Sequence, residues 1–198
     1  MPEIILASGS HVRKKLLTNA GLSFRAQPAR IDEAAIKAAL AAENATPRDI
    51  ADALAEFKAR KVAEKHPGAV VIGTDQVLEF QGGILSKPAS RDAVSEQLRA
   101  LRGQQHRLLS AVVVYEDAEP VWRHVGQVRL TMRDVSDGFL NAYLDRNWPG
   151  ISDSVGGYKL EEEGIRLFSR VEGDYFTVLG LPLLDLLGFL AQKGVIDG

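Results

Sequence analysis

Near its amino terminus the chain runs Ile4-Ile5-Leu6-Ala7-Ser8-Gly9-Ser10-His11-Val12-Arg13-Lys14-Lys15-Leu16-Leu17, and this stretch decides the fold. Its first residues form a short apolar run, which predicts a buried strand. The small residues Ser8-Gly9-Ser10 then predict a loop that lets another group approach the backbone closely. Ser10 is a natural N-cap for the helix that follows. Free N–H groups and the positive end of the helix dipole therefore meet at this loop, which favours an anion site.

Cations occupy the first turns of this predicted helix, at Arg13, Lys14 and Lys15. A positive side chain at that end opposes the helix dipole, so helix stability does not explain the position of Arg13. A bound phosphate would explain it. The alternative is a plain strand–turn–helix unit whose cations are ordinary surface residues.

Composition sets the class of protein. The chain has 198 residues with 45% hydrophobic and 25% charged residues, which fits one domain or two small lobes sharing a core. A net charge of −2 provides no overall basic field to hold a nucleic-acid polymer. The absence of cysteine excludes disulfides, thiolate metal sites and cysteine nucleophiles. No apolar stretch reaches membrane-spanning length and no signal pattern is present, so we expect no membrane partner and a cytoplasmic protein.

A second informative stretch is Ala69–Phe80, whose first half is a continuous apolar run. This pattern is typical of a strand buried on both faces. Asp75 follows the end of the run, and ligands of α/β proteins bind near the carboxyl ends of strands. The carboxylate of Asp75 is therefore a candidate functional group. The alternative is an aspartate that only forms a turn.

Periodicity and capping signals predict the remaining elements of an α/β protein. The loop at 152–164 is rich in glycine and acidic residues, a composition typical of a mobile surface loop. We expect helices at 34–43, 47–64, 90–101, 136–146 and from Pro182 onward, and strands at 23–27, 106–115, 121–132, 165–171 and 176–179.

Common catalytic signatures are missing from the sequence. It has no P-loop, no dinucleotide-binding glycine motif and no His-Glu-x-x-His. A dispersed set of charged residues remains, and it suits a polyphosphate substrate with a divalent cation, because cations neutralise phosphates and carboxylates hold hard metals or activate water. Spacing alone does not bring these residues together. The set comprises Arg13, Lys58 and Lys87 as cations and Glu33 and Asp75 as carboxylates.

Seven short motifs occur in one order along almost the whole chain, and together they resemble the Maf-like family of nucleoside triphosphate pyrophosphatases. Each motif is weak by itself, whereas seven in register are specific. They are Leu6-Ala7-Ser8-Gly9-Ser10-x-x-Arg13, Asp32-Glu33, Glu56-Phe57-Lys58-Ala59, Gly73-Thr74-Asp75-Gln76-Val77, Ser86-Lys87-Pro88, Gly156-Gly157-Tyr158-Lys159-Leu160-Glu161 and Thr177-Val178-Leu179-Gly180-Leu181-Pro182-Leu183.

The resemblance implies a fold and a reaction. The expected fold is α/β, an elongated mixed sheet with flanking helices and two lobes around a central cleft, similar to inosine triphosphate pyrophosphatases. Residues 1–198 would form a single Maf-like domain whose lobes are not separable domains. The implied reaction cleaves a nucleoside triphosphate between the α and β phosphates with Mg²⁺ or Mn²⁺, as nucleotide house-cleaning. Family analogy also suggests a homodimer.

The resemblance assigns roles residue by residue. Asp75 matches the catalytic proton acceptor, and Asp75 with Glu33 would hold the metal. The substrate-binding positions are Ser8, Ser10, Arg13, Lys58 and Lys87.

Three positions separate substrate groups in this family, here Val12, Gln76 and Glu161. Gln76 and Glu161 resemble the group that acts on 7-methyl-GTP, and a carboxylate can accept hydrogen bonds from guanine N–H groups and attract a cationic base. Val12 departs from that group, which usually has tryptophan there. An aromatic residue would stack on a cationic purine and valine does not, so the base preference stays open.

Two other functions compete with this interpretation. One is a non-catalytic nucleotide-binding regulator of cell division and septum formation, which would bind triphosphates without turnover. The other is a phosphatase that releases orthophosphate. The identity of the products separates all three.

Overall fold

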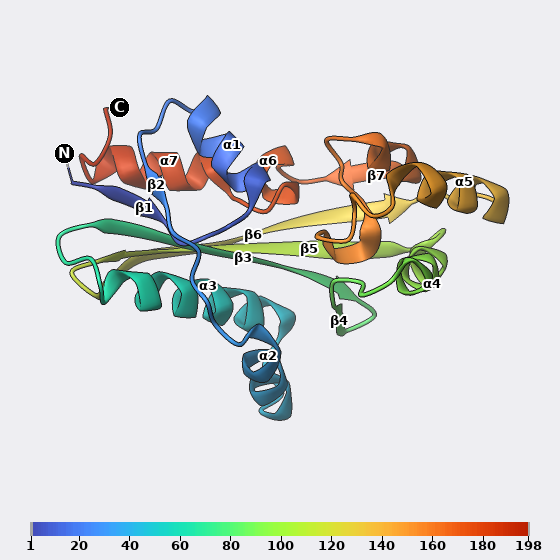
Figure 1. Cartoon of the computed structure of the whole chain (residues 1–198), viewed down its shortest axis with the longest axis horizontal. Coiled ribbons are helices and arrows are strands. Elements are labelled where there is room, and N and C mark those ends of the chain that lie inside the picture. The colour runs from blue at the N-terminus through green and yellow to red at the C-terminus, as the bar shows by residue number, and fades with distance from the viewer. Residues whose placement is uncertain (1, 198) are drawn as a thin grey trace. The chain divides into compact units, whose positions relative to one another are not determined.

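The computed structural model describes residues 2–197 as helices packed on a mixed β-sheet (Figure 1). The strands are β1 (Ile4–Leu6), β2 (Arg25–Ala26), β3 (Val70–Phe80), β4 (Gly83–Leu85), β5 (Gln105–Glu116), β6 (Glu119–Met132) and β7 (Phe168–Glu172). The helices are α1 (His11–Asn19), α2 (Glu33–Ala42), α3 (Pro47–Ala63), α4 (Arg91–Leu101), α5 (Asp137–Asn147), α6 (Tyr175–Val178) and α7 (Leu183–Gln192), with 3₁₀ helices η1 (Val155–Gly157) and η2 (Glu163–Leu167).

The sheet has seven strands in the order β2-β1-β3-β5-β6-β7, with β4 paired to β3. β1 is parallel to both β2 and β3, whereas β4 is antiparallel to β3 and β7 is antiparallel to β6. An open mixed sheet with flanking helices confirms the predicted α/β class. In the part of the chain that the structure describes, no helix is both long and apolar enough to cross a membrane.

The chain divides into two compact units. Unit 1 contains the chain up to Gln76, Leu109–Gly126 and the chain from Asp174 onward, and unit 2 contains Val77–Leu108 and Gln127–Gly173. Strands β3, β5 and β6 contribute residues to both units. The expectation of one domain with inseparable lobes stays a prediction.

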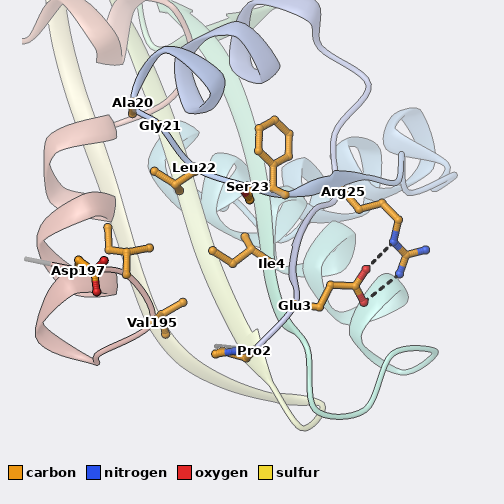
Figure 2. A pocket seen from close by; sticks show the side chains of 12 residues that line it. Pro2, Glu3, Ile4, Ala20, Gly21, Leu22, Ser23, Arg25, Val195 and Asp197 are labelled. Atoms are coloured by element: carbon orange, nitrogen blue, oxygen red, sulfur yellow. Dashed lines mark hydrogen bonds and ion pairs between the residues drawn. The ribbon is translucent and has the colours of Figure 1, made fainter.

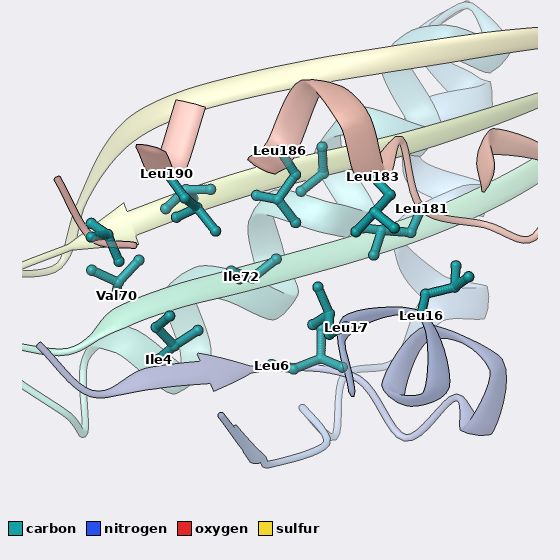
Figure 3. Packing of buried hydrophobic residues seen from close by; sticks show 13 residues of the cluster. Ile4, Leu6, Leu16, Leu17, Val70, Ile72, Leu181, Leu183, Leu186 and Leu190 are labelled. Atoms are coloured by element: carbon teal, nitrogen blue, oxygen red, sulfur yellow. The ribbon is translucent and has the colours of Figure 1, made fainter. Parts of the chain in front are cut away.

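The core of unit 1 is built from the apolar runs that the sequence singled out. Ile4 and Leu6 of β1, with Val70 and Ile72 of β3, pack against leucines of α1 and α7 (Figure 3). Leu6 and Ile72 have no exposed surface. Burial of this kind stabilises a fold by roughly 1.5–3 kcal/mol for each large aliphatic side chain, so this cluster fixes β1 and the start of α1 in place.

On the other face of β3, helix α3 approaches the strand unusually closely. Its N-cap Thr46 forms a capping box with Asp49 and Pro47 follows at the first helical position, which confirms the predicted start of this helix. A Cβ atom on Gly73 of β3 would lie 2.2 Å from the carbonyl oxygen of Ala55 and 2.7 Å from the Cβ of Ala59. Glycine at 73 and alanines on the facing helix are therefore what allow the contact.

Two predicted strand segments near the end of the chain are wrong. Residues 176–179 were expected to be a strand, but helix α6 covers Tyr175–Val178. The Asp174 side chain explains the difference, because its Oδ2 accepts from the Thr177 N–H at 2.7 Å and caps the helix. The strand expected from Ile165 begins only at Phe168, because η2 occupies the preceding residues.

The glycine-rich segment of unit 2 is packed, although its composition is typical of a mobile loop. Gly156, Gly157 and Tyr158 are buried, and the Tyr158 hydroxyl lies 2.7 Å from the Nε2 of buried His106. Gly156 has a φ of +77°, and a Cβ there would lie 2.6 Å from a Leu78 methyl group. The glycines therefore permit a tight turn against β3 rather than mobility.

We expect Gly73→Ala to lower the free energy of unfolding by about 3 kcal/mol, because the added methyl group overlaps the α3 backbone. Urea denaturation monitored by circular dichroism measures this. Gly188→Ala in α7 is the matched control, since no atom lies within 4 Å of a Cβ there. That control should gain roughly 0.5–1 kcal/mol from helix propensity. Equal stability of Gly73→Ala and the native protein would refute the close contact.

Candidate active site

The loop between β1 and α1 is held together by its own serines. The Oγ of Ser8 accepts from the Ser10 N–H at 3.2 Å, and Ser8 is 6% exposed. The Oγ of Ser10 accepts from the Arg13 N–H at 3.4 Å, which confirms Ser10 as the N-cap of α1. The structure therefore confirms the predicted strand–loop–helix unit, and anion binding at its helix amino end stays a prediction.

Arg13 crosses from α1 to two other parts of unit 1. Its Nε donates to the carbonyl oxygen of Gly180 at 2.8 Å, and its Nη1 donates to the carbonyl oxygen of Thr74 at 3.3 Å and to Ser8 at 3.4 Å. Burial lowers the pKa of Arg13, whereas the negative charges of Asp75 and Glu33 raise it. Arginine remains charged at physiological pH, so a fixed cation lies at the serine loop.

The predicted carboxylates meet at one lysine. The Nζ of Lys58 lies 2.6 Å from the Oδ1 of Asp75 and 2.7 Å from the Oε1 of Glu33. Asp75 and Lys58 are 5% and 9% exposed, whereas the Glu33 side chain is 43% exposed. The sequence named all three residues, but it did not predict that Lys58 joins the two carboxylates.

The local structure explains this meeting. Alternate residues of a strand share a face, so Asp75 lies on the same side of β3 as Gly73, toward α3. The close packing at Gly73 brings α3 near enough for Lys58 to reach Asp75. Glu33 enters at the first residue of α2, whose N-cap is Asp32.

The sheet has a local opening beside Asp75. β1 pairs with β3 only as far as Ile72, β4 pairs with β3 from Leu78 onward, and β5 is the other neighbour of β3. Within residues 2–197 the edge of β3 from Gly73 to Gln76 thus has no strand partner on the β1 side. Arg13 donates to one carbonyl of this edge, that of Thr74. The prediction that Asp75 follows the end of its strand is wrong, because β3 continues through Asp75 to Phe80. The strand that ends here is β1, and ligands of α/β proteins bind near such strand ends.

The side-chain amide of Gln76 has a fixed orientation. Its Nε2 donates to the Oγ of Ser110 at 2.9 Å and to the carbonyl oxygens of Val178 at 2.9 Å and Thr177 at 3.2 Å. Ser110 itself donates to the Thr177 carbonyl at 2.7 Å, so it accepts from the amide. The amide nitrogen must face these oxygens, which leaves the Oε1 of Gln76 as an acceptor. Sequence reasoning missed Ser110 and Gly180, since neither carries a charge or a capping signal.

Two predicted site residues belong to unit 2. Lys87 follows β4 and precedes Pro88, and Glu161 lies in the turn between η1 and η2. Both side chains are exposed. The third specificity position, Val12, is the second residue of α1 in unit 1 and is half-buried.

The donor set fits a hard divalent cation. Glu33 and Asp75 supply carboxylate oxygens, the ligands that Mg²⁺ prefers. Because both oxygens contact the same nitrogen, they lie no farther apart than the sum of the two contact distances. No group of three or more His, Cys, Asp and Glu side chains converges within residues 2–197. Substrate oxygens or water would therefore complete the coordination.

A separate pocket of about 650 Å³ lies at the opposite end of β1 (Figure 2). Its wall includes Ile4, Leu22 and Val195, and at its side Arg25 and Glu3 form an ion pair at 2.8 Å. None of the predicted site residues lines it.

The chain belongs to the Maf-like family: residues 3–193 match the family described as Maf-like protein. It is 61% identical over 194 residues to a nucleoside triphosphate pyrophosphatase of Ruegeria pomeroyi, an alignment that covers 98% of each chain. It is 48% identical to a 7-methyl-GTP pyrophosphatase of Rhizobium meliloti, with 99% of this chain and 98% of the relative covered.

Among solved structures, a HAM1 protein from Coxiella burnetii matches with a TM-score of 0.46 and 16% sequence identity. The match covers 68% of this chain and 75% of the other.

We expect Lys58→Met to lower the free energy of unfolding by about 3 kcal/mol, because it leaves the buried Asp75 carboxylate without its cation. Adding Asp75→Asn to this variant should recover a large part of the loss. Urea denaturation of the two single variants and the double variant gives the coupling energy. Strictly additive effects would contradict a direct interaction.

Proposed function

We propose that this protein is a nucleoside triphosphate pyrophosphatase, a hydrolase that produces a nucleoside monophosphate and pyrophosphate. The observation that carries the proposal is the Asp75–Lys58–Glu33 cluster, whose charges act on the Arg13 guanidinium of the serine loop. Family membership and the names of close relatives support the same activity. The substrate is a free nucleotide, since a net charge of −2 does not favour a polymer.

The candidate site residues of unit 1 have these roles in the proposal. The amino end of α1 and Arg13 bind the phosphates and stabilise the negative charge that develops on them. Asp75 orients the attacking water and accepts its proton. In the ligand-free protein Lys58 holds the Asp75 carboxylate in place through their contact. Glu33 and Asp75 would hold Mg²⁺ or Mn²⁺, which when bound neutralises phosphate charge and polarises water.

We further propose that the base is a purine of the 7-methyl-GTP type. The Oε1 acceptor of Gln76 suits the N–H groups of guanine. A relative at 48% identity carries the name 7-methyl-GTP pyrophosphatase. Val12 provides no aromatic surface, so stacking on a cationic base contributes little in this chain.

Incubation with Mg²⁺ and a panel of 7-methyl-GTP, GTP, UTP, dTTP and CTP should release monophosphate and pyrophosphate, fastest from 7-methyl-GTP. Asp75→Asn should lower kcat by about 10²–10⁴-fold, because the water loses its proton acceptor. Chromatography of the products and a pyrophosphate assay measure both effects.

The matched control for this experiment is Asp52→Asn in α3, since the Asp52 carboxylate pairs with Arg123 rather than with the cluster. Orthophosphate as the first product would replace the proposal with a phosphatase. Tight triphosphate binding without any cleavage would indicate a binding regulator.

Val12→Trp should lower the KM for 7-methyl-GTP by roughly 5- to 30-fold, since stacking on a cationic ring contributes about 1–2 kcal/mol. The KM for unmethylated GTP should fall less, because its base carries no charge. Val12→Leu controls for added volume. KM is measured for both nucleotides with each variant. An equal fall in KM for 7-methyl-GTP and GTP would contradict recognition of a cationic base.

A further inference from the structure

Lys58 occupies the place that a metal ion would need. Its ammonium group lies within hydrogen-bonding distance of both Glu33 and Asp75, the two carboxylates that fit a divalent cation. A lysine ammonium and a divalent ion compete for the same lone pairs when both lie between the same oxygens. A divalent cation that takes the Oδ1 of Asp75 or the Oε1 of Glu33 therefore displaces Lys58 from that oxygen.

Displacement leaves Lys58 in an unfavourable position. The residue is 9% exposed on α3, and a buried ammonium without a partner costs several kcal/mol. Neighbouring carboxylates of α3 are already engaged: Glu56 accepts from Tyr115 and pairs with Arg123, and Asp52 also pairs with Arg123. An anionic ligand would supply Lys58 with a new partner.

The charge balance of the cluster points the same way. The charges of four groups, the cations Arg13 and Lys58 and the carboxylates Glu33 and Asp75, sum to zero. A divalent ion alone would add two positive charges beside the buried Lys58. A polyphosphate that enters with the ion supplies negative oxygens for both the metal and Lys58.

We propose that Lys58 is an exchangeable counter-ion that couples metal binding to polyphosphate binding. In the ligand-free protein Lys58 holds both carboxylates and excludes the free divalent cation. When a metal–nucleotide complex binds, Lys58 pairs with the phosphates and the metal binds the carboxylates of Glu33 and Asp75. The proposal rests on the proposed function only in taking a polyphosphate as the ligand. Since coupling between two ligands is reciprocal, the metal must also tighten nucleotide binding.

Two binding measurements test this proposal without catalysis. Electron paramagnetic resonance of free Mn²⁺ gives the affinity of the protein for Mn²⁺ alone. Calorimetry with α,β-methylene-GTP, which has no cleavable α–β bridge, gives the nucleotide affinity with and without Mn²⁺. In the native protein Mn²⁺ should tighten nucleotide binding by about tenfold or more.

The variants isolate the charge of Lys58. Lys58→Gln should bind Mn²⁺ alone about tenfold more tightly than the native protein, because the competing cation is gone, and its metal–nucleotide coupling should fall below about threefold. Lys58→Arg keeps the charge and should retain the coupling. Lys61→Gln, on the same helix but with its ammonium on the Arg30 carbonyl, should behave like the native protein.

The outcomes are distinct. Equal Mn²⁺ affinity of Lys58→Gln and the native protein overturns the proposal. If circular dichroism shows that Lys58→Gln does not fold, the test is the nucleotide affinity of the native protein with and without Mn²⁺. Equal affinities in the two conditions overturn the proposal. Strong coupling in a protein that cleaves no triphosphate would leave the counter-ion role intact and remove the proposed function instead.

Discussion

The contact between Lys58 and Asp75 depends on how closely α3 approaches β3, and much of unit 1 is arranged around that approach. Gly73 and the facing alanines remove the side-chain volume that normally separates a helix from a sheet. Desolvation makes the resulting ion pair sensitive to geometry, since a buried charge without its partner is far more costly than an exposed one. A packing feature without any polar side chain therefore determines whether Lys58 reaches Asp75.

The cluster around Asp75 and the hydrogen bonds of Gln76 lie on opposite faces of β3. Asp75 faces α3, whereas Gln76 faces Ser110 and α6. A continuous sheet would keep these faces apart, but β1 stops pairing at Ile72 and the edge of β3 is then open. Arg13 uses this edge to contact the Thr74 carbonyl and act electrostatically on Asp75. Under the proposed function, the short first strand would allow the serine loop and the carboxylate cluster to bind one ligand.

Local signals in the sequence predicted the parts whose causes are local. The Ser10 cap, the capping box at Thr46 and the apolar run before Asp75 each act within a few residues. The pairing of Lys58 with Asp75 joins a helix to a strand, and the register between them is set by packing that no short motif encodes. The strand predicted at 176–179 failed for a related reason. Its β-branched and aromatic residues favour a strand, but the Asp174 cap and tertiary contacts decide for helix α6.

The tethering of Gln76 has a consequence for how this protein can diverge. Its amide nitrogen covers two carbonyl oxygens at the end of α6, Thr177 and Val178, so one side chain both presents an acceptor and fastens a distant part of the chain. A substitution at this position would also remove the amide donor to the Val178 carbonyl, whereas the Thr177 carbonyl keeps the Ser110 hydroxyl and the Gly180 N–H. New preferences at position 76 are therefore expected to arise together with compensating changes around Ser110 or in the 174–180 turn. Under the proposed function, base recognition and attachment of the 174–180 turn are thus linked through one residue.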